Sequence, residues 1–157
     1  MRPLILAPAM LAYTGAAALA AEPSLEQLLA TPSPVEIVAK WKAVCLDHAG
    51  DASAQRRAVR ELNIDWPYQV MFDKDAGKPA CLMVSSIEPQ ATAQSLGDAI
   101  IQASAPVVLE NAELRDNTFR ATTVIDGSIF RVQAGLRPSQ GVTTAVVVLI
   151  DMKAKLQ

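Results

Sequence analysis

Apolar residues follow a helical spacing through the first part of the chain and an alternating spacing through the rest. Between residues 35 and 48 they recur every three or four positions, as one buried helix face requires: Ile37, Val38, Trp41, Val44 and Cys45. Residues 33–36, Ser-Pro-Val-Glu, are typical of a helix start with a capping box, because proline is tolerated at the first helical position. We therefore expect a helix that follows the Ser33 cap, with Pro34 at its first position, and runs to about residue 48.

Two further helices are expected. Gly50 fits a helix stop and Asp51 fits the next cap, so a second helix should follow closely. Its inward side would carry Ala54, Ala58, Val59 and Leu62. Residues 90–104 indicate a third helix in which Gly97 is a weak point. Its apolar stripe consists of Ala93, Leu96, Ile100 and Ala103.

The alternating part begins after Pro67 and indicates strands. Tyr68, Val70 and Phe72 lie on one face of a first strand. Residues 73–79 supply a turn, and residues 80–87 return as a second strand. From residue 107 onward the pattern is that of a β-meander.

The dipeptide Asp126-Gly127 sets the register of one hairpin in this meander, since a two-residue loop with positive φ at both positions favours it. Counting outward, Ile125 faces Ser128, and the pairs Thr123–Phe130, Ala121–Val132 and Phe119–Ala134 follow. That face of the hairpin is largely apolar. The other face carries Arg120, Arg131 and Gln133 and is expected to remain partly wet.

The last strand, residues 142–151, contains the unbroken apolar run 145–150. Such a run favours a central strand buried on both faces, although an aggregation-prone edge strand has the same pattern. The fold class that we expect is α+β. N-terminal helices, a β-hairpin and a helix precede an antiparallel β-meander, and the strands form one twisted sheet with helices on one face.

The N-terminal residues predict export. Residues 1–20 combine Arg2, an apolar stretch and the small residues Ala18 and Ala20, which is typical of a signal peptide cut between Ala20 and Ala21. Residues 21–34 form a proline-rich tether, and residues 35–157 a single α+β domain. We expect a periplasmic or secreted protein without membrane insertion after cleavage, because the mature chain lacks about 18 consecutive uncharged apolar residues.

Charge narrows the class of partner. After cleavage the chain has 13 basic and 16 acidic residues, a net charge of −3. This mild acidity gives no reason to expect nucleic acid as a partner.

The two cysteines of the chain, Cys45 and Cys81, are expected to form a structural disulfide, as export favours. A redox-active or metal-binding pair is the alternative, but it lacks C-x-x-C spacing and nearby ligands. His48, the single histidine, lies one helical turn from Cys45, which allows a Cys-His dyad. If Cys45 is oxidised, that dyad has no nucleophile.

Two groups of residues are candidate binding sites. Arg120, Arg131 and Gln133 form a candidate interaction surface for a carboxylate or an acidic partner, or simply a solubilising face. A candidate pocket between sheet and helices is lined by Trp41, Phe72, Phe119 and Phe130. Trp66-Pro67 is either an anchor for a partner or a staple that closes the helices over the sheet.

A loose motif connects these features. The chain resembles small exported proteobacterial proteins of unknown function. The resemblance lies in Trp41-Lys42-Ala43-Val44-Cys45, in Gly50-Asp51, and in Trp66-Pro67 before a hairpin with Cys81. The resemblance covers residues 35 to 90. It implies an exported protein with a disulfide and brings no activity with it.

We expect binding rather than catalysis, because no nucleophile elbow, P-loop or dinucleotide motif is found in the sequence. The leading hypothesis is an exported, non-enzymatic interaction protein with a protein partner, an inhibitor or immunity-type factor for an envelope or secreted enzyme. The alternative is a periplasmic small-molecule binder or enzyme with a pocket between sheet and helices. No cofactor or metal is expected.

Overall fold

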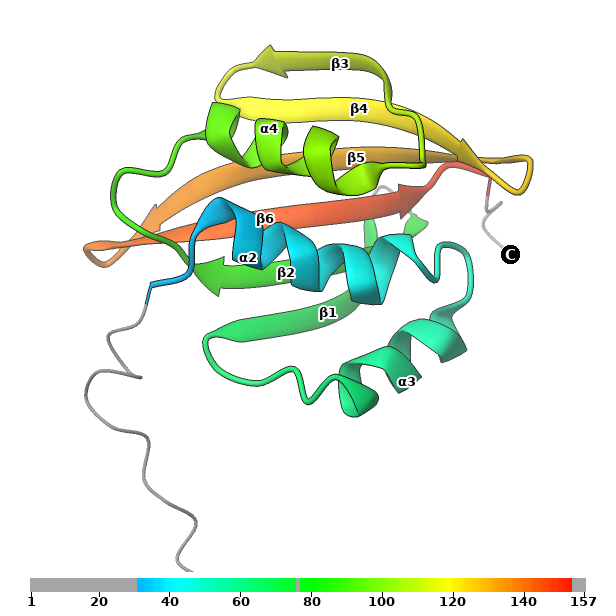
Figure 1. Ribbon diagram of the computed structural model, residues 1–157, viewed down its shortest axis with the longest axis horizontal. Helices are drawn as coiled ribbons and strands as arrows, with labels where there is room; N and C mark the ends of the chain where they lie inside the picture. Colours follow the sequence, from blue (N-terminus) through cyan, green and yellow to red (C-terminus); the bar gives the residue numbers. More distant parts are fainter. Residues whose placement is uncertain (1–30, 76, 154–157) are drawn as a thin grey trace, which may run out of the picture.

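The computed structural model describes residues 31–75 and 77–153, in which one antiparallel sheet of six strands is packed against helices. Helices α2 (Pro34–Trp41) and α4 (Ala93–Ser104) lie side by side over the sheet (Figure 1). The predicted α+β class is therefore confirmed. The predicted signal peptide and residues 21–30 of the predicted tether lie outside the described residues.

The strands of the sheet are β1 (Tyr68–Asp75), β2 (Lys78–Ser86), β3 (Glu110–Arg115), β4 (Thr118–Ile125), β5 (Ser128–Ser139) and β6 (Val142–Asp151). Their order across the sheet is β1-β2-β6-β5-β4-β3. The strands are joined by four hairpins, β1–β2, β3–β4, β4–β5 and β5–β6, and by one long connection through a helix between β2 and β3. The register predicted from Asp126-Gly127 is confirmed, since Ile125 pairs with Ser128 and Phe119 with Ala134. The first turn is tighter than predicted, because strand pairing continues to Asp75 and Lys78.

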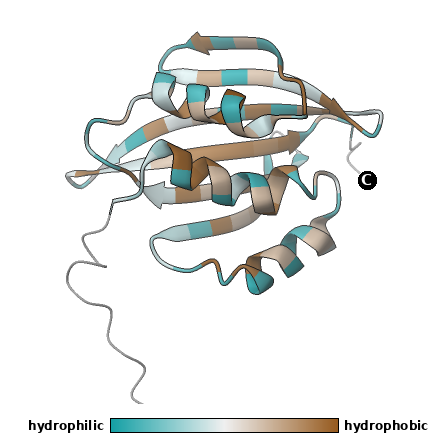
Figure 2. Cartoon of the chain, in the orientation of Figure 1, coloured by the Kyte–Doolittle hydropathy of each residue, from teal (hydrophilic) through white to brown (hydrophobic). Residues whose placement is uncertain are grey.

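Strand β6 lies in the middle of the sheet, between β2 and β5, and is largely hydrophobic along its length (Figure 2). Its central position agrees with the prediction, but burial on both faces is found only at the end of the apolar run, where Leu149 and Ile150 are both buried. Ala145 and Val147 face the helices and are buried, whereas Val146 and Val148 face the other way and are only half-buried. The helices of the described residues cover one face of the sheet. The apolar run therefore contributes side chains both to the core and to the face that no described helix covers.

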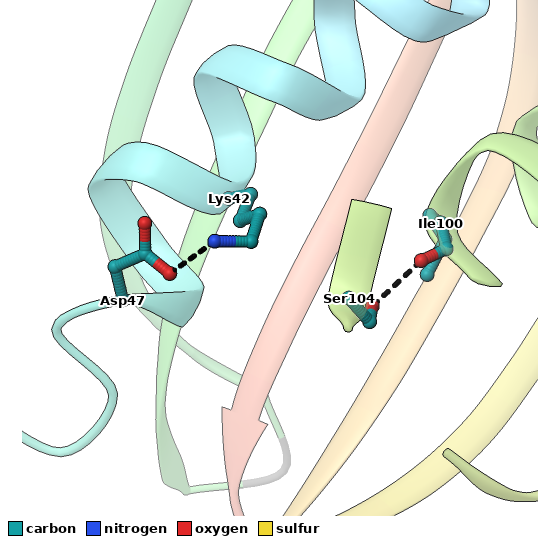
Figure 3. A network of polar contacts seen from close by, with 4 residues as sticks. All are labelled: Lys42, Asp47, Ile100 and Ser104. Carbon is teal, nitrogen blue, oxygen red and sulfur yellow. Dashed lines mark hydrogen bonds and ion pairs between the residues drawn. The ribbon is translucent and has the colours of Figure 1, made fainter. Parts of the chain in front are cut away.

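The helices are α2 (Pro34–Trp41), a π-helical turn η1 (Lys42–Leu46), α3 (Ala52–Glu61) and α4 (Ala93–Ser104). The helix predicted to run from the Ser33 cap to about residue 48 is thus α2 continued by η1. The Lys42 ammonium donates to Asp47 Oδ1 at 2.6 Å across this turn, while at the end of α4 the Ser104 hydroxyl donates to the Ile100 carbonyl at 2.6 Å (Figure 3). Both contacts satisfy polar groups near helix ends.

The core lies between the helices and the inner face of the sheet. Its largest fully buried side chains are Trp41, Ile37, Met83, Leu96 and Ile100. Helix α3 lies at the margin of this layer and buries only Gln55 and Ala58. The predicted inward position of Leu62 is wrong, because α3 ends at Glu61 and the Leu62 side chain is 47% exposed.

A disulfide between Cys45 and Cys81 joins η1 to β2, as predicted, with 5.7 Å between the Cα atoms. Both residues belong to the core cluster and are nearly inaccessible to solvent. The bond therefore fixes the helical layer to the inner face of the sheet.

Gly97 is the contact point of α4 with the sheet. A Cβ atom at this position would lie 2.5 Å from Cδ2 of Phe119, whose ring is buried on β4. The sequence marked Gly97 as a weak point because glycine lowers helix propensity. The structure shows that glycine instead permits close approach of helix and sheet.

The start of α2 is held by the predicted capping box. The Glu36 carboxylate accepts from the Ser33 backbone N–H at 2.8 Å, and the Glu36 N–H donates to the Ser33 hydroxyl at 3.3 Å. The backbone hydrogen bond from Ser33 is the main cause that lowers the pKa of Glu36 from its usual value.

Replacement of both cysteines by alanine is expected to lower the free energy of unfolding by about 3–4 kcal/mol, because the unfolded chain then loses the constraint of a closed loop. Urea unfolding of oxidised wild type and of the Cys45→Ala/Cys81→Ala variant measures the difference. Thiol titration of the denatured, non-reduced protein should find no free thiol. Two free thiols would disprove the bond.

Gly97→Ala is expected to destabilise the protein by about 1–3 kcal/mol, although alanine favours a helix over glycine, because the new methyl group overlaps the buried ring. Thermal or urea unfolding measures the change. In a Phe119→Leu background, Gly97→Ala should lower the free energy of unfolding by less than it does in the wild type, because the ring that the methyl group overlaps is absent. A stabilising effect of Gly97→Ala alone would contradict the close contact.

The stability contribution of Glu36 is expected to depend on pH. Because folding lowers the pKa of Glu36, its contribution is complete above the unfolded pKa and is lost as pH falls through the folded pKa. Glu36→Gln should therefore be less stable than wild type at neutral pH, and the difference should shrink as pH falls through the folded pKa of Glu36. A difference in unfolding free energy that stays constant over this range would contradict the lowered pKa.

Candidate functional site

The outer face of the sheet, opposite the helices, carries side chains in rows that run across the strands. The register aligns one such row from edge to edge: Met71, Leu82, Val148, Gln133, Arg120 and Glu113. The row is apolar over β1, β2 and β6 and polar over β5, β4 and β3. A partner that crosses the strands would therefore meet an apolar surface and then a charged one.

The polar half of this face contains a hollow of about 370 Å³. We call it the arginine hollow; its polar lining residues are Asn111, Glu113, Arg120, Thr122, Arg131 and Gln133. It contains all three residues of the predicted interaction surface, from β4 and β5. The sequence revealed Arg120, Arg131 and Gln133 through the hairpin register, but not the residues of β3, whose pairing includes a register shift.

Strand register explains how the two arginines come together. Arg120 pairs with Gln133, and Thr122 pairs with Arg131, so the arginines are diagonal neighbours on the same face. Diagonal side chains on adjacent strands are within reach of each other when they are long. The arrangement places two guanidinium groups at one site.

The arginines of the hollow are not neutralised by the carboxylates of the described residues. Neither arginine forms an ion pair there, even though Glu113 lies opposite Arg120 in the register. The Nε atom of Arg120 is buried and has no hydrogen-bond partner in the described ranges. On the wall of the hollow, Asn111 Nδ2 donates to Thr122 Oγ1 at 3.2 Å. The hollow thus offers unused guanidinium donors.

The apolar half of the outer face borders the hollow directly. We call it the apolar strip; it consists of Met71, Leu82, Val84, Val146 and Val148. Met71 is 46% exposed and the others are half-buried, because neighbouring side chains shield them but no helix of the described residues covers them. Leu82 pairs with both Met71 and Val148, which makes the strip continuous over three strands.

The aromatic residues predicted to line a pocket are divided between two places. Phe72 and Phe130 line a cavity of about 450 Å³ next to α3, which we call the α3 cavity. Trp41 and Phe119 are buried in the core and do not contribute to it. Gln55 and Arg56 of α3 also line this cavity, and the sequence pattern did not indicate them because their role depends on where α3 lies.

The remaining candidates carry no catalytic arrangement. His48 is half-buried and near Cys45, but the sulfur of Cys45 is in the disulfide, so the Cys-His dyad lacks its thiol. Within residues 31–75 and 77–153, no cluster of three or more metal-ligating His, Cys, Asp or Glu side chains is found. The helices described there are too short or too polar to cross a membrane.

Trp66 does not close the helices over the sheet. Its side chain is 61% exposed, in the segment that connects α3 to β1. The expectation of a buried staple is therefore wrong, because Ile64 of the same segment packs against the core instead. An exposed tryptophan is consistent with the other interpretation, an anchor for a partner.

No protein-family model matches the chain, and no curated protein matches it in sequence. The geometry of the arginine hollow, the apolar strip and the α3 cavity therefore carries the functional argument alone.

Proposed function

We propose that this protein is an exported, non-enzymatic interaction protein that binds a partner protein through the outer face of its sheet. The observation that carries the proposal is the arginine hollow, in which two arginines without ion pairs to the described residues lie beside the apolar strip. The core on the opposite face is filled by large side chains such as Trp41 and Met83. Recognition is accordingly assigned to the outer face.

A carboxylate is the group that best completes the hollow. Guanidinium groups match carboxylates in geometry, and such hydrogen bonds are about twice as strong as those between neutral groups. The terminal guanidinium donors of Arg120 and Arg131 form no ion pair with the described residues, and they are the groups that a bound carboxylate would contact. Glu113 on the wall repels a second negative charge, so the partner segment carries an isolated Asp or Glu rather than an acidic run.

The size of the face favours a protein partner. Six strands about 4.8 Å apart give a row roughly 24 Å long, comparable with one side of a protein–protein interface. Burial of the apolar strip would supply the hydrophobic part of the binding free energy, and the hollow would supply specificity. The partner segment therefore combines an aliphatic side chain with a nearby carboxylate.

The proposal also includes the location of the protein and the class of its partner. The N-terminal sequence favours a periplasmic or secreted location, and the Cys45–Cys81 disulfide is consistent with an oxidising compartment. The resemblance to small exported proteobacterial proteins supports the same location. An envelope or secreted enzyme is the partner class that we propose, with this chain as its inhibitor or immunity-type factor.

Arg120→Glu/Arg131→Glu is expected to abolish capture of the partner, because it replaces both donors with carboxylates. The matched control is Arg57→Glu/Arg60→Glu, which makes the same charge change on exposed positions of α3. Crosslinking capture from extracellular and periplasmic fractions of the source cells should enrich one protein with wild type and control. Its affinity for the hollow variant, measured with purified proteins, should fall at least about tenfold.

Equal affinity of the partner for wild type and the hollow variant would contradict the assignment to this face. Failure of wild type to enrich any specific protein would contradict the proposed function as a whole. Circular dichroism and thermal unfolding of both variants verify that the fold is retained.

A further inference from the structure

The α3 cavity, on the other side of the sheet from the arginine hollow, has the features of a small-molecule site. Its volume of about 450 Å³ lies within the range of known ligand pockets, roughly 300–1,000 Å³. Phe72, Phe130 and Leu149 line it from the inner face of β1, β5 and β6. Phe72 is half-buried, whereas Phe130 and Leu149 are each 2% exposed, so an apolar group of a ligand would meet mainly the ring of Phe72.

The charged side chains that line the cavity are balanced in sign. Two are cationic, Arg56 and Lys74, and two are anionic, Asp73 and Asp151. None of them forms an ion pair among the described residues. A site for an anion or a cation alone would carry an excess of the opposite charge, so the balance favours a ligand with one positive and one negative group.

Arg56 is positioned to bind the negative group. Its guanidinium lies over the ring of Phe72, with Cζ 5.0 Å from the ring centroid, and it forms no ion pair with the described residues. The N-terminus of α3 does not compete for an anion, because the Asp51 carboxylate already accepts from the Ala54 N–H at 2.9 Å. An external carboxylate therefore finds its donors on Arg56 and Lys74.

Gln55 and Asp151 provide acceptors for the positive group. The Gln55 side chain is only 7% exposed, and its Nε2 donates to the Cys45 carbonyl at 3.1 Å, so its amide orientation is fixed. Its Oε1 accepts no hydrogen bond from the described residues, although the side chain lines the cavity. Asp151 uses Oδ1 for the Lys153 N–H at 3.0 Å, which leaves Oδ2 for a ligand.

We propose that the α3 cavity binds a free α-amino acid with an aromatic or large aliphatic side chain. Its carboxylate contacts Arg56 and Lys74, its ammonium contacts Gln55 Oε1 and Asp151, and its side chain packs on Phe72 and Phe130. The site is independent of the proposed protein interface, since the two share no residue.

Three probes with the same phenyl group test the zwitterion requirement: L-phenylalanine, 3-phenylpropionate and phenethylamine. In titration calorimetry with the full mature protein, L-phenylalanine should bind at least about tenfold more tightly than either analogue, because each analogue leaves one set of charged groups unpaired. Amide NMR shifts should change at Gln55, Phe72 and Phe130. No binding of L-phenylalanine, or equal binding of an analogue, would overturn the proposal.

Variants test the contact between Arg56 and the carboxylate of the ligand. Arg56→Gln should weaken L-phenylalanine and 3-phenylpropionate by about tenfold and leave phenethylamine unchanged, whereas Arg57→Gln, the exposed neighbour that does not line the cavity, should change none. Equal losses in both arginine variants would overturn the assignment. Arg120→Glu/Arg131→Glu should keep full affinity for L-phenylalanine, so failure of the protein interface and failure of this site are observed separately.

Discussion

The strand register makes the two faces of the sheet different over its whole width. Along β2, β4, β5 and β6, alternate residues are buried on the side of the helices, and most of the residues between them face away and are half-buried or exposed. Because side chains alternate strictly along a strand, a slip of one residue anywhere would exchange the two sets. Both proposed sites depend on this constraint. The arginine hollow requires Arg120 and Arg131 on the outer parity, and the α3 cavity requires Phe72 and Phe130 on the inner one.

Two contacts of different kinds hold the helical layer against the sheet. The Cys45–Cys81 bond ties η1 to β2 covalently, and at β4 the lack of a side chain on Gly97 lets α4 approach the ring of Phe119. Between them, large side chains such as Trp41 fill the interior, so no ligand space remains at its centre. In the part of the chain that the structure describes, the α3 cavity lies at the margin of the core, where the short helix α3 buries little of its surface. The position of the α3 cavity follows from that incomplete coverage.

Much of this fold was predictable, because local signals determine it. The capping box at residues 33–36 defined the start of α2, and Asp126-Gly127 defined a register that placed Arg120, Arg131 and Gln133 on one face. Features that depend on long-range packing were not predictable. The sequence does not show which helix covers each aromatic residue. The four residues expected to line one pocket are therefore found in two places, the core and the α3 cavity. The apolar run of β6 was expected to be covered twice, since a sequence does not show that all described helices lie on one side.

Methionine footprinting tests the two-faced sheet most directly. Met71 lies on the outer face of β1 and is 46% exposed, whereas Met83 lies on the inner face of β2 and is fully buried. Limited oxidation of the native protein, followed by peptide mass spectrometry, should modify Met71 rapidly and leave Met83 unmodified until the protein unfolds. Equal oxidation of the two residues, or faster oxidation of Met83, would show that the helices do not cover the face assigned to them, and it would contradict both proposed sites.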